Sequence, residues 1–318
     1  MKNYWVLILA LLMAHCYSTS KEDNLIKIDK QNKKGQEIIV LGIAQDAGYP
    51  QIGCKKICCT SIDNDHCKGE WVSCLGLLDH DSKSFYIFDA SPDFDKQYDY
   101  LKNTYSGYQL AGIFLTHAHI GHYTGLMQLG HEAMAAKNVP VYVMPRMGSF
   151  LENNGPWSQL VKFNNIQLMP ISNEESIALP NGLKVIPFLV PHRDEFSETV
   201  GFKIIGINNT ALFIPDINKW NIWKKDIVQE VSKVNYAFLD ATFYEEAELP
   251  SRNMSEIPHP FVPETKALFS KSESFEKAKI HFIHLNHSNP LLRENTKAYS
   301  ETISQGYYIS KTFELYSL

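Results

Sequence analysis

Short apolar runs recur along the chain and alternate with polar stretches. The runs are rich in Val, Ile, Leu and Phe, and most are too short for helices, so they predict strands. Two segments, 125–136 and 224–233, instead space their apolar residues as an amphipathic helix does. The pattern predicts a mixed α/β fold in which helices cover sheets. The predicted strands are residues 37–44, 84–90, 111–116, 139–145, 166–171, 183–191, 200–207, 210–217, 236–240 and 279–285.

Residues 1–22 form a separate segment. Lys2 precedes an uninterrupted apolar run, 4–14, which is too short to cross a membrane and has the length of a secretory signal. We therefore expect an exported, periplasmic protein. Cys16 follows the run and is a candidate for attachment of a lipid anchor, as in a lipoprotein. The alternative is an ordinary signal peptide that is cleaved and removes Cys16.

The remaining chain, 36–318, shows no repeat, linker or change of composition, which predicts a single domain. The formal net charge is -5 and basic residues are not clustered. These features give no electrostatic footprint for nucleic acid or for an anionic membrane. We expect a small-molecule substrate, with membrane contact only through an N-terminal lipid anchor.

Three histidines follow one predicted strand, in the segment LTHAHIGHYTG, residues 115–125. In an extended chain His117 and His119 point to the same side, as two ligands of one metal ion must. His122 begins the predicted helix and can face a neighbouring ion. This spacing favours a metal site over three unrelated histidines.

Other polar residues also close apolar runs. Asp89 ends YIFD, His192 ends FLVPH, Asp216 ends LFIPD and His284 ends HFIH, with His287 soon after. A single histidine after a strand is usually a satisfied core or surface residue. The recurrence of such side chains at successive strand ends instead indicates a functional site.

In this order, these residues and the HAHIGH segment resemble the five motifs of the metallo-beta-lactamase superfamily. The segments GIAQDAGYPQIGC, THAHIGHYTGLMQLG, RNMSEIPHP and HLNHSNP are similar to the branch typified by pyrroloquinoline quinone biosynthesis protein B. The resemblance implies an αββα sandwich, in which two sheets lie face to face, helices cover them and metal ions bind at one edge.

The resemblance also implies ligands for two ions. The ligands of the first ion would be His117, His119 and His192. The ligands of the second would be His122, Asp216 and His284, with Asp216 bridging both ions. Asp89 would accept a proton from a ligand imidazole and fix its tautomer. Zinc suits this set, although manganese or iron would also accept it.

Hydrolases of this superfamily usually carry an aspartate ligand at the position that is Gly121 here. The second ion would keep three ligands and a water, which still makes four. Asp46, in the turn after the first strand, is a candidate for the missing carboxylate, because that turn should reach the metal edge. The other interpretation of Asp46 is an aspartate that caps a glycine turn.

Two further histidines, His287 and His259, are candidates for the acid or base that moves protons at the leaving group, provided that they reach it. The sequence does not rank them. Arg252, in the same loop as His259, is a candidate for binding a substrate carboxylate or phosphate. The other interpretation of Arg252 is an ordinary solvated side chain.

Four cysteines gather after the Asp46 turn: Cys54, Cys58, Cys59 and Cys67. The resemblance implies a structural zinc in this loop, and three of these cysteines with His66 would provide four ligands. In an oxidising compartment the cysteines could instead form two disulfides, and Cys54–Cys59 with Cys58–Cys67 is one of three pairings. Both interpretations stay open. Cys74 is expected as a buried small apolar residue.

We therefore expect a metal-dependent hydrolase that uses water activated between two zinc ions to cleave an ester-like bond, such as a phosphodiester, lactone, lactam or thioester. One alternative is a catalytically reduced, ligand-binding protein in which Gly121 has eliminated the second ion. Another is an iron-dependent oxidative enzyme related to quinone-cofactor synthesis. Six ligand-type residues at strand ends favour the enzyme, because buried polar clusters destabilise a fold unless they are satisfied.

Overall fold

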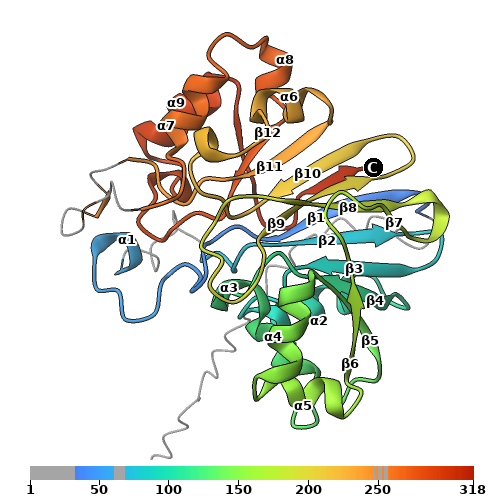
Figure 1. Ribbon diagram of the computed structural model, residues 1–318. Helices are drawn as coiled ribbons and strands as arrows, with labels where there is room; N and C mark the ends of the chain where they lie inside the picture. Colours follow the sequence, from blue (N-terminus) through green and yellow to red (C-terminus); the bar gives the residue numbers. More distant parts are fainter. Residues whose placement is uncertain (1–32, 61–68, 246–247, 250–252, 254–256) are drawn as a thin grey trace, which may run out of the picture. The chain divides into compact units, whose positions relative to one another are not determined.

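Two sheets form the centre of the structure, a computed structural model that describes residues 33–60, 69–245, 248–249, 253 and 257–318 (Figure 1). Within this described part each sheet has seven strands, in the orders β14-β1-β2-β3-β4-β5-β6 and β13-β12-β11-β10-β9-β8-β7. The strands of the first sheet are β1 (Gln36–Gly42), β2 (Cys74–Asp79), β3 (Ser84–Phe88), β4 (Gln109–Phe114), β5 (Val139–Val143), β6 (Ile166–Pro170) and β14 (Leu315–Ser317). The strands of the second sheet are β7 (Ile177–Ala178), β8 (Lys184–Leu189), β9 (Val200–Ile205), β10 (Thr210–Ile214), β11 (Tyr236–Asp240), β12 (Ile280–Ile283) and β13 (Tyr308–Ile309).

Helices lie on the outer faces of both sheets (Figure 1). On the first sheet these are α2 (Phe94–Thr104), α3 (Ile120–Tyr123), α4 (Pro145–Asn153) and α5 (Trp157–Lys162). On the second sheet they are α6 (Ile227–Ser232), α7 (Val262–Leu268), α8 (Ser274–Lys277) and α9 (Lys297–Ser304). A short helix, α1 (Ile57–Thr60), lies in the loop after β1. Two mixed sheets with helices outside are the αββα sandwich that the resemblance implied, so this prediction is confirmed.

The side chains of β1 point alternately into two hydrophobic cores. Ile38 and Val40 point into the core between the sheets, whereas Ile39 and Leu41 point into the core between the first sheet and its helices. All four are fully buried. Successive side chains of a strand point to opposite faces, so a strand that is apolar throughout can fill both layers.

Strand direction brings several strand ends to one edge. In the first sheet β3 and β4 are parallel, and β1 runs the same way as β3 because each is antiparallel to β2. In the second sheet β10, β11 and β12 are parallel, and β8 shares their direction through β9. The segments that follow these strands therefore meet at one end of the sandwich.

The predicted helix over 125–136 is wrong. After the short α3 the chain forms a 3-10 stretch, Thr124–Leu129, and then turns. Gly125 explains the difference, because its N–H donates to Ala90 O and an added Cβ would lie 2.2 Å from Ser91 O. A close approach of two backbones thus overrides the apolar periodicity of this segment.

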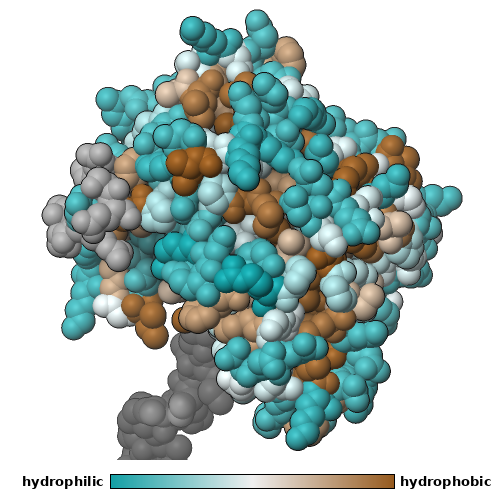
Figure 2. Space-filling view, in the orientation of Figure 1, coloured by the Kyte–Doolittle hydropathy of each residue, from teal (hydrophilic) through white to brown (hydrophobic). Residues whose placement is uncertain are grey.

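The predicted signal peptide, residues 1–22, with the candidate lipid-anchor site Cys16, lies outside the described residues, so export remains a prediction. Among the described helices none is long and apolar enough to span a membrane. On the face shown in Figure 2, apolar residues form small groups between hydrophilic ones.

Candidate metal centre

Three histidines and one carboxylate converge where β4, β8 and β10 end. His117 Nε2 lies 2.9 Å from His119 Nδ1 and 3.3 Å from Asp216 Oδ2. His192 Nε2 lies 3.2 Å from both of these atoms. Four ligand atoms at about 2.0–2.1 Å from a zinc ion would lie roughly 3.3 Å apart at the corners of a tetrahedron. The four side chains therefore fit one metal ion.

A second group lies beside the first. The Nε2 atoms of His122 and His284 each lie 3.6 Å from Asp46 Oδ1, and His122 Nε2 lies 3.8 Å from Asp216 Oδ2. These two nitrogens and Asp46 Oδ1 are buried and have no hydrogen-bond partner. Unpaired buried polar atoms are rare, and three that face one another fit a second ion. Asp216 Oδ2 lies near nitrogens of both groups.

Each of the three histidines that follow β4 turns one ring nitrogen towards the centre, and its other ring nitrogen has an oxygen partner. His122 Nδ1 donates to Asp89 Oδ2 at 2.7 Å, and His117 Nδ1 lies 2.9 Å from Thr116 Oγ1. The Thr116 hydroxyl in turn lies 2.9 Å from Asp89 Oδ1. His119 Nε2 lies 3.3 Å from Glu195 Oε2. Such partners fix the tautomer that leaves the opposite nitrogen free for a metal.

The second sheet repeats this arrangement around Asp240. His284 Nδ1 lies 2.9 Å from Thr242 Oγ1, which donates to Asp240 Oδ1 at 2.7 Å. His259 Nδ1 donates directly to Asp240 Oδ2 at 2.8 Å. In addition, His192 Nδ1 donates to Asn218 Oδ1 at 3.0 Å. Each sheet thus contributes one buried aspartate that orients two histidines, one directly and one through a threonine.

Backbone strain is present at two of these positions. Asp89 and His284 have φ values of 70° and 63°, in the left-handed region that residues other than glycine seldom adopt. Each follows directly after its strand, β3 or β12. Local strain of this kind is retained where the surrounding structure requires one orientation of a side chain, as at functional sites.

The electrostatics of the centre suit a cation. Burial lowers the pKa of His117 well below its usual value, so its imidazole is neutral and offers a lone pair near neutral pH. For His122 burial acts in the same direction, but the carboxylates of Asp89 and Asp46 outweigh it and raise the pKa well above its usual value. Burial alone would raise the pKa of Asp216, yet His192 and His259 hold it well below the usual range. The centre therefore holds ionised carboxylates that attract positive charge.

His259 lies beside the centre as a protonated group. Burial opposes its charge, but Asp240 and Asp216 outweigh this effect and raise the pKa of His259 to about 9. Its Nδ1 lies 3.2 Å from Asp216 Oδ1. His259 also lines a cavity of about 630 Å³, together with Gln45, Gln51, Arg193, Phe243, Leu249, Ile257, Pro258, Asn286 and His287. This cavity is the candidate substrate pocket, because it adjoins the metal-type residues.

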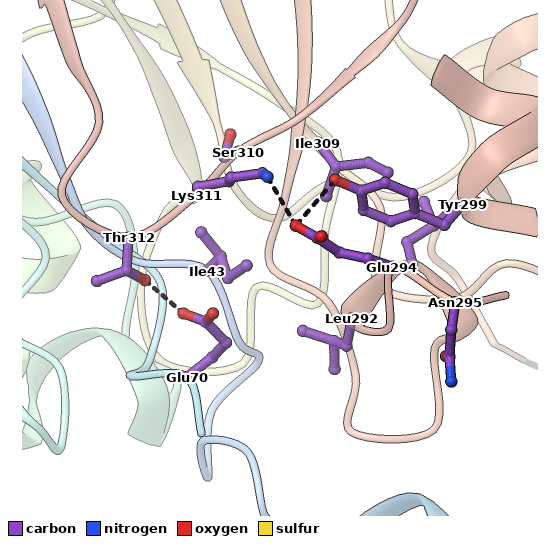
Figure 3. A pocket seen from close by; sticks show the side chains of 11 residues that line it. Ile43, Glu70, Leu292, Glu294, Asn295, Tyr299, Ile309, Ser310, Lys311 and Thr312 are labelled. Atoms are coloured by element: carbon purple, nitrogen blue, oxygen red, sulfur yellow. Dashed lines mark hydrogen bonds and ion pairs between the residues drawn. The ribbon is translucent and has the colours of Figure 1, made fainter. Parts of the chain in front are cut away.

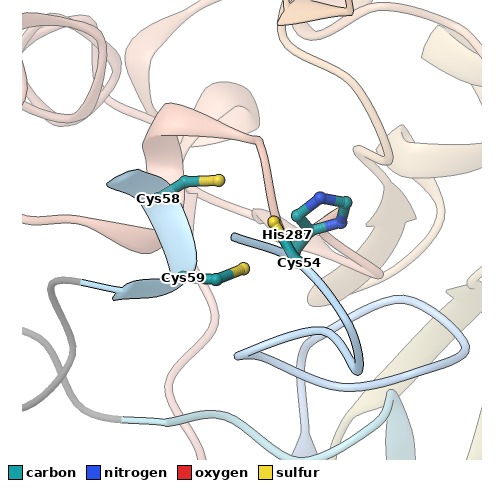
Figure 4. Close-up of side chains that lie close together, drawn as sticks. All are labelled: Cys54, Cys58, Cys59 and His287. Carbon is teal, nitrogen blue, oxygen red and sulfur yellow. The ribbon is translucent and has the colours of Figure 1, made fainter. Parts of the chain in front are cut away.

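A cysteine cluster adjoins this pocket through His287. Ligand atoms of Cys54, Cys58, Cys59 and His287 lie within 4.8 Å of one another (Figure 4). The described cysteines are free thiols, and Cys54 and Cys59 form no disulfide. Burial raises the pKa of Cys59 to about 12, so a metal bound there would have to displace its proton. Three thiols and one imidazole are a common zinc ligand set.

A separate cavity of about 520 Å³ lies between the loop after β1 and the segment around β13 (Figure 3). Lys311 Nζ and Tyr299 OH both approach Glu294 Oε1, at 2.7 and 3.5 Å. Thr312 Oγ1 donates to Glu70 Oε2 at 2.5 Å. The polar groups of this cavity are largely satisfied by one another, unlike those of the metal centre.

The structure brings together the sequence-predicted ligands and adds residues that sequence analysis missed. His287, predicted as a candidate acid or base at the leaving group, lies with the cysteines. His66, Cys67 and Arg252 lie outside the described residues. Asp240 was missed, although it ends the apolar run YAFLD in the same way as Asp216 ends its own. Cys74 is fully buried, as expected.

Comparisons with known proteins agree with this geometry. Residues 85–301 match the family described as Beta-lactamase superfamily domain. The coenzyme PQQ synthesis protein B of Ruegeria pomeroyi is 22% identical over 299 residues, which cover 86% of this chain and 97% of that protein. The crystal structure of Zn²⁺-bound PqqB from Methylobacterium extorquens matches with a TM-score of 0.73 and 19% identity, covering 89% of this chain and 100% of that one.

A second solved structure, described as a new diphosphatase from the PhnP family, matches with a TM-score of 0.63 and 18% identity. It covers 89% of this chain and 97% of that one. At these identities the structural matches establish the fold. Together with the family match over most of the chain, they show that this protein belongs to the metallo-beta-lactamase superfamily and is PqqB-like.

Proposed function

We propose that this protein is a zinc-dependent hydrolase that cleaves an ester-like bond in a small molecule. The observation that carries the proposal is the set of five histidines at the metal centre. In each, one ring nitrogen faces the centre while the other has an oxygen partner. Oriented imidazoles around a shared carboxylate are the arrangement expected of a metal site. Zinc is favoured by this donor set and by the Zn²⁺-bound relative of the same fold.

Metal ions held here would supply Lewis acidity, which makes a water molecule more acidic and stabilises negative charge on the group under attack. The residues of the chain provide the rest. His117, His119 and His192 would hold an ion at the first position, and Asp216 lies between this group and the second one. Asp89 and Asp240 hold the imidazoles in one orientation, so that little reorganisation is needed during reaction.

His259 is the candidate general acid. The carboxylates of Asp240 and Asp216 raise its pKa, and it lies beside Asp216 and lines the pocket. A positioned acid of this kind donates to the leaving oxygen as the bond breaks. His287 is less suited, because burial lowers its pKa and the imidazole is neutral near pH 7.

The pocket indicates the shape and charge of the substrate. Phe243, Leu249 and Ile257 offer an apolar wall, while amides and Arg193 offer polar contacts. The Arg193 guanidinium lies 3.7 Å from Glu195 on the exposed rim and can bind an anionic group. We propose a substrate with an apolar body and one anionic group, for which a phosphodiester is the first candidate.

The test is hydrolysis of a panel of phosphodiester, lactone, lactam and thioester substrates by the full chain, before and after chelation and after return of zinc. We expect turnover of at least one ester-like substrate, loss of turnover on chelation and recovery with zinc. No turnover of any substrate by the zinc-loaded protein, with ligand binding intact, would favour a binding protein instead. Oxygen consumption that depends on iron would favour an oxidative enzyme.

His259→Asn separates the general acid from the metal centre. We expect turnover to fall about 100-fold for substrates with alkyl leaving groups, which need a proton, and to change little for p-nitrophenyl esters. An equal loss for both leaving groups would contradict the assignment of His259 as the acid.

A further inference from the structure

We propose that Asp46 supplies the carboxylate of the second metal position, and that Gly121 is a glycine because Asp46 occupies the space of its side chain. We refer below to this arrangement, in which the carboxylate comes from position 46 and position 121 is a glycine, as the exchange. The inference rests on the proposed metal centre and adds to it a complete second site.

The distances around Asp46 are those of ligands around an ion. Asp46 Oδ1 lies 3.6 Å from the Nε2 atoms of both His122 and His284. Hydrogen bonds in proteins measure about 2.7–3.2 Å, so neither contact is a direct hydrogen bond. Two ligand atoms at about 2.0–2.2 Å from one ion lie roughly 3.3–3.6 Å apart in a tetrahedral site. The equal separations thus leave room for a cation among the three atoms.

Burial excludes an ordinary solvated aspartate. The Asp46 side chain is 43% exposed as a whole, yet its Oδ1 is buried and has no hydrogen-bond partner. The interpretation of Asp46 as a turn cap does not fit this atom, because the Gly48 N–H donates to Gln45 O instead. A buried carboxylate oxygen without a partner destabilises the fold unless something neutralises it.

Gly121 and Asp46 exclude one another sterically. A Cβ at Gly121 would lie 2.1 Å from Asp46 Oδ1, 2.7 Å from its Cα and 2.9 Å from its Cγ. Two of these atoms belong to the carboxyl group and one to the backbone, so rotation of the side chain alone would not relieve the overlap. The position of Gly121 has a negative φ in α3, so left-handed geometry does not explain the glycine.

The Asp46 turn is fixed to the segment that carries His284. Gln45 N donates to Leu285 O at 2.9 Å, and Asn286 Nδ2 donates to Gln45 Oε1 at 2.6 Å. Because β1 and β12 both end at the metal edge, these bonds hold the Asp46 carboxylate beside the His284 imidazole. The carboxylate is therefore preorganised, as a metal ligand should be.

The test compares the wild-type full chain with Asp46→Gly, Gly121→Asp and the double variant Asp46→Gly/Gly121→Asp. Zinc is titrated into metal-free protein, bound ions per chain are counted by elemental analysis, and thermal unfolding is recorded. Asp95→Asn, on the exposed face of α2, is the control for loss of one negative charge. Asp46→Asn is included because it removes the charge with little change of shape.

We expect Asp46→Gly and Asp46→Asn to keep the first ion and to bind the second more than about 100-fold more weakly, beyond the usual effect of losing an outer partner. Gly121→Asp should lower the melting temperature, because two side chains then share one volume. The double variant should recover only part of the melting temperature, because the Cα at position 46 still lies 2.7 Å from the new Cβ. Asp95→Asn should match the wild type.

Second-ion affinity in Asp46→Asn equal to that of the wild type would overturn the exchange while leaving the first ion and the proposed hydrolase intact. A melting temperature of Gly121→Asp equal to that of the wild type would also overturn it. If the wild type itself binds no ion that depends on His117, both the exchange and the proposed function fail.

Discussion

The metal centre and the cysteine cluster both gather metal-type side chains, but they are built in different ways. At the centre, most side chains follow directly after strands whose directions place them at one edge. At the cluster, Cys54, Cys58 and Cys59 lie in and beside the short α1, and His287 comes from a loop near the C-terminus. Sheet topology therefore positions the side chains of the metal centre, whereas contacts between loops position those of the cysteine cluster.

The two regions also differ in the hydrogen-bond partners of their histidines. Each histidine of the centre has a partner on its second ring nitrogen, and Asp89 and Asp240 are fully buried. By contrast, His287 Nδ1 is buried without a partner. We interpret the centre as preorganised for reaction and the cluster as a structural site on the wall of the pocket.

The strongest expected effect is on the shared carboxylate. Asp216→Asn should reduce turnover of the best ester-like substrate by about 1,000-fold, equivalent to about 4 kcal/mol, because it removes the charge of the carboxylate that lies between the two proposed metal positions. Steady-state kinetics at saturating zinc measure the effect, with Asp95→Asn as the control. Turnover within a few fold of the wild type would contradict the interpretation that the metal centre is the reactive region and the cysteine cluster a structural one.

A buried histidine outside both regions gives a reference for pH dependence. Burial lowers the pKa of His281 to about 4, so the folded protein leaves it neutral where the unfolded chain, with a pKa near 6.5, takes up a proton. Stability from this group is therefore present above pH 6.5 and is lost as the pH falls towards 4, by about 3 kcal/mol in total.

Denaturant unfolding of the wild type and of His281→Gln between pH 7 and 4 checks this expectation. The glutamine can still bond to Tyr316 OH, which lies 3.1 Å from His281 Nδ1, but it does not titrate. The wild type should lose more stability than the variant over this range. Equal losses would show that His281 takes up its proton in the folded state.

Asp89→Asn tests the hydrogen bonds that orient the histidines of the centre. The amide accepts a hydrogen bond from His122 less strongly than the carboxylate does, so we expect zinc affinity to fall between about 10-fold and 100-fold. Zinc titration in competition with a chromogenic chelator measures this change. An unchanged affinity would mean that Asp89 serves only the fold around Thr116.

The smallest effect on turnover is expected at the cysteine cluster. Cys58→Ser should remove the ion of the cluster and lower the melting temperature, because metal binding there is coupled to folding. Turnover should stay within about threefold of the wild type, since none of the described cysteines lines the candidate substrate pocket. A loss as large as that of Asp216→Asn would show that the cluster, rather than the strand ends, carries the reaction.

The sequence predicts the metal centre better than the cysteine cluster, because strand ends leave a pattern in the sequence and loop contacts do not. Asp89, His192 and Asp216 each close an apolar run, so the strand pattern alone indicates that they meet at a sheet edge. Asp240 closes such a run as well and could have been found by the same rule. The apolar spacing after His122 predicted a helix that the structure does not contain, because Gly125 makes a close backbone contact that periodicity does not reveal.

The cysteine cluster could not be assembled from spacing. The resemblance implied His66 as the fourth ligand, and this prediction lies outside the described residues. The structure places His287 beside the three thiols. Loop contacts between distant segments leave no periodic signal in a single sequence. Asp46 is an intermediate case: strand direction predicts the edge it reaches, but only the structure shows that it fills the space beside Gly121.

The most direct test of the account is the metal content of the full chain, purified without chelator or nickel affinity, beside that of His117→Ala/Asp216→Ala. Any ion at the cysteine cluster is common to both proteins and cancels in the difference. The account predicts that the wild type holds two more zinc ions per chain than the variant. No difference between the two proteins would contradict it, because the strand-end residues would then not be metal ligands.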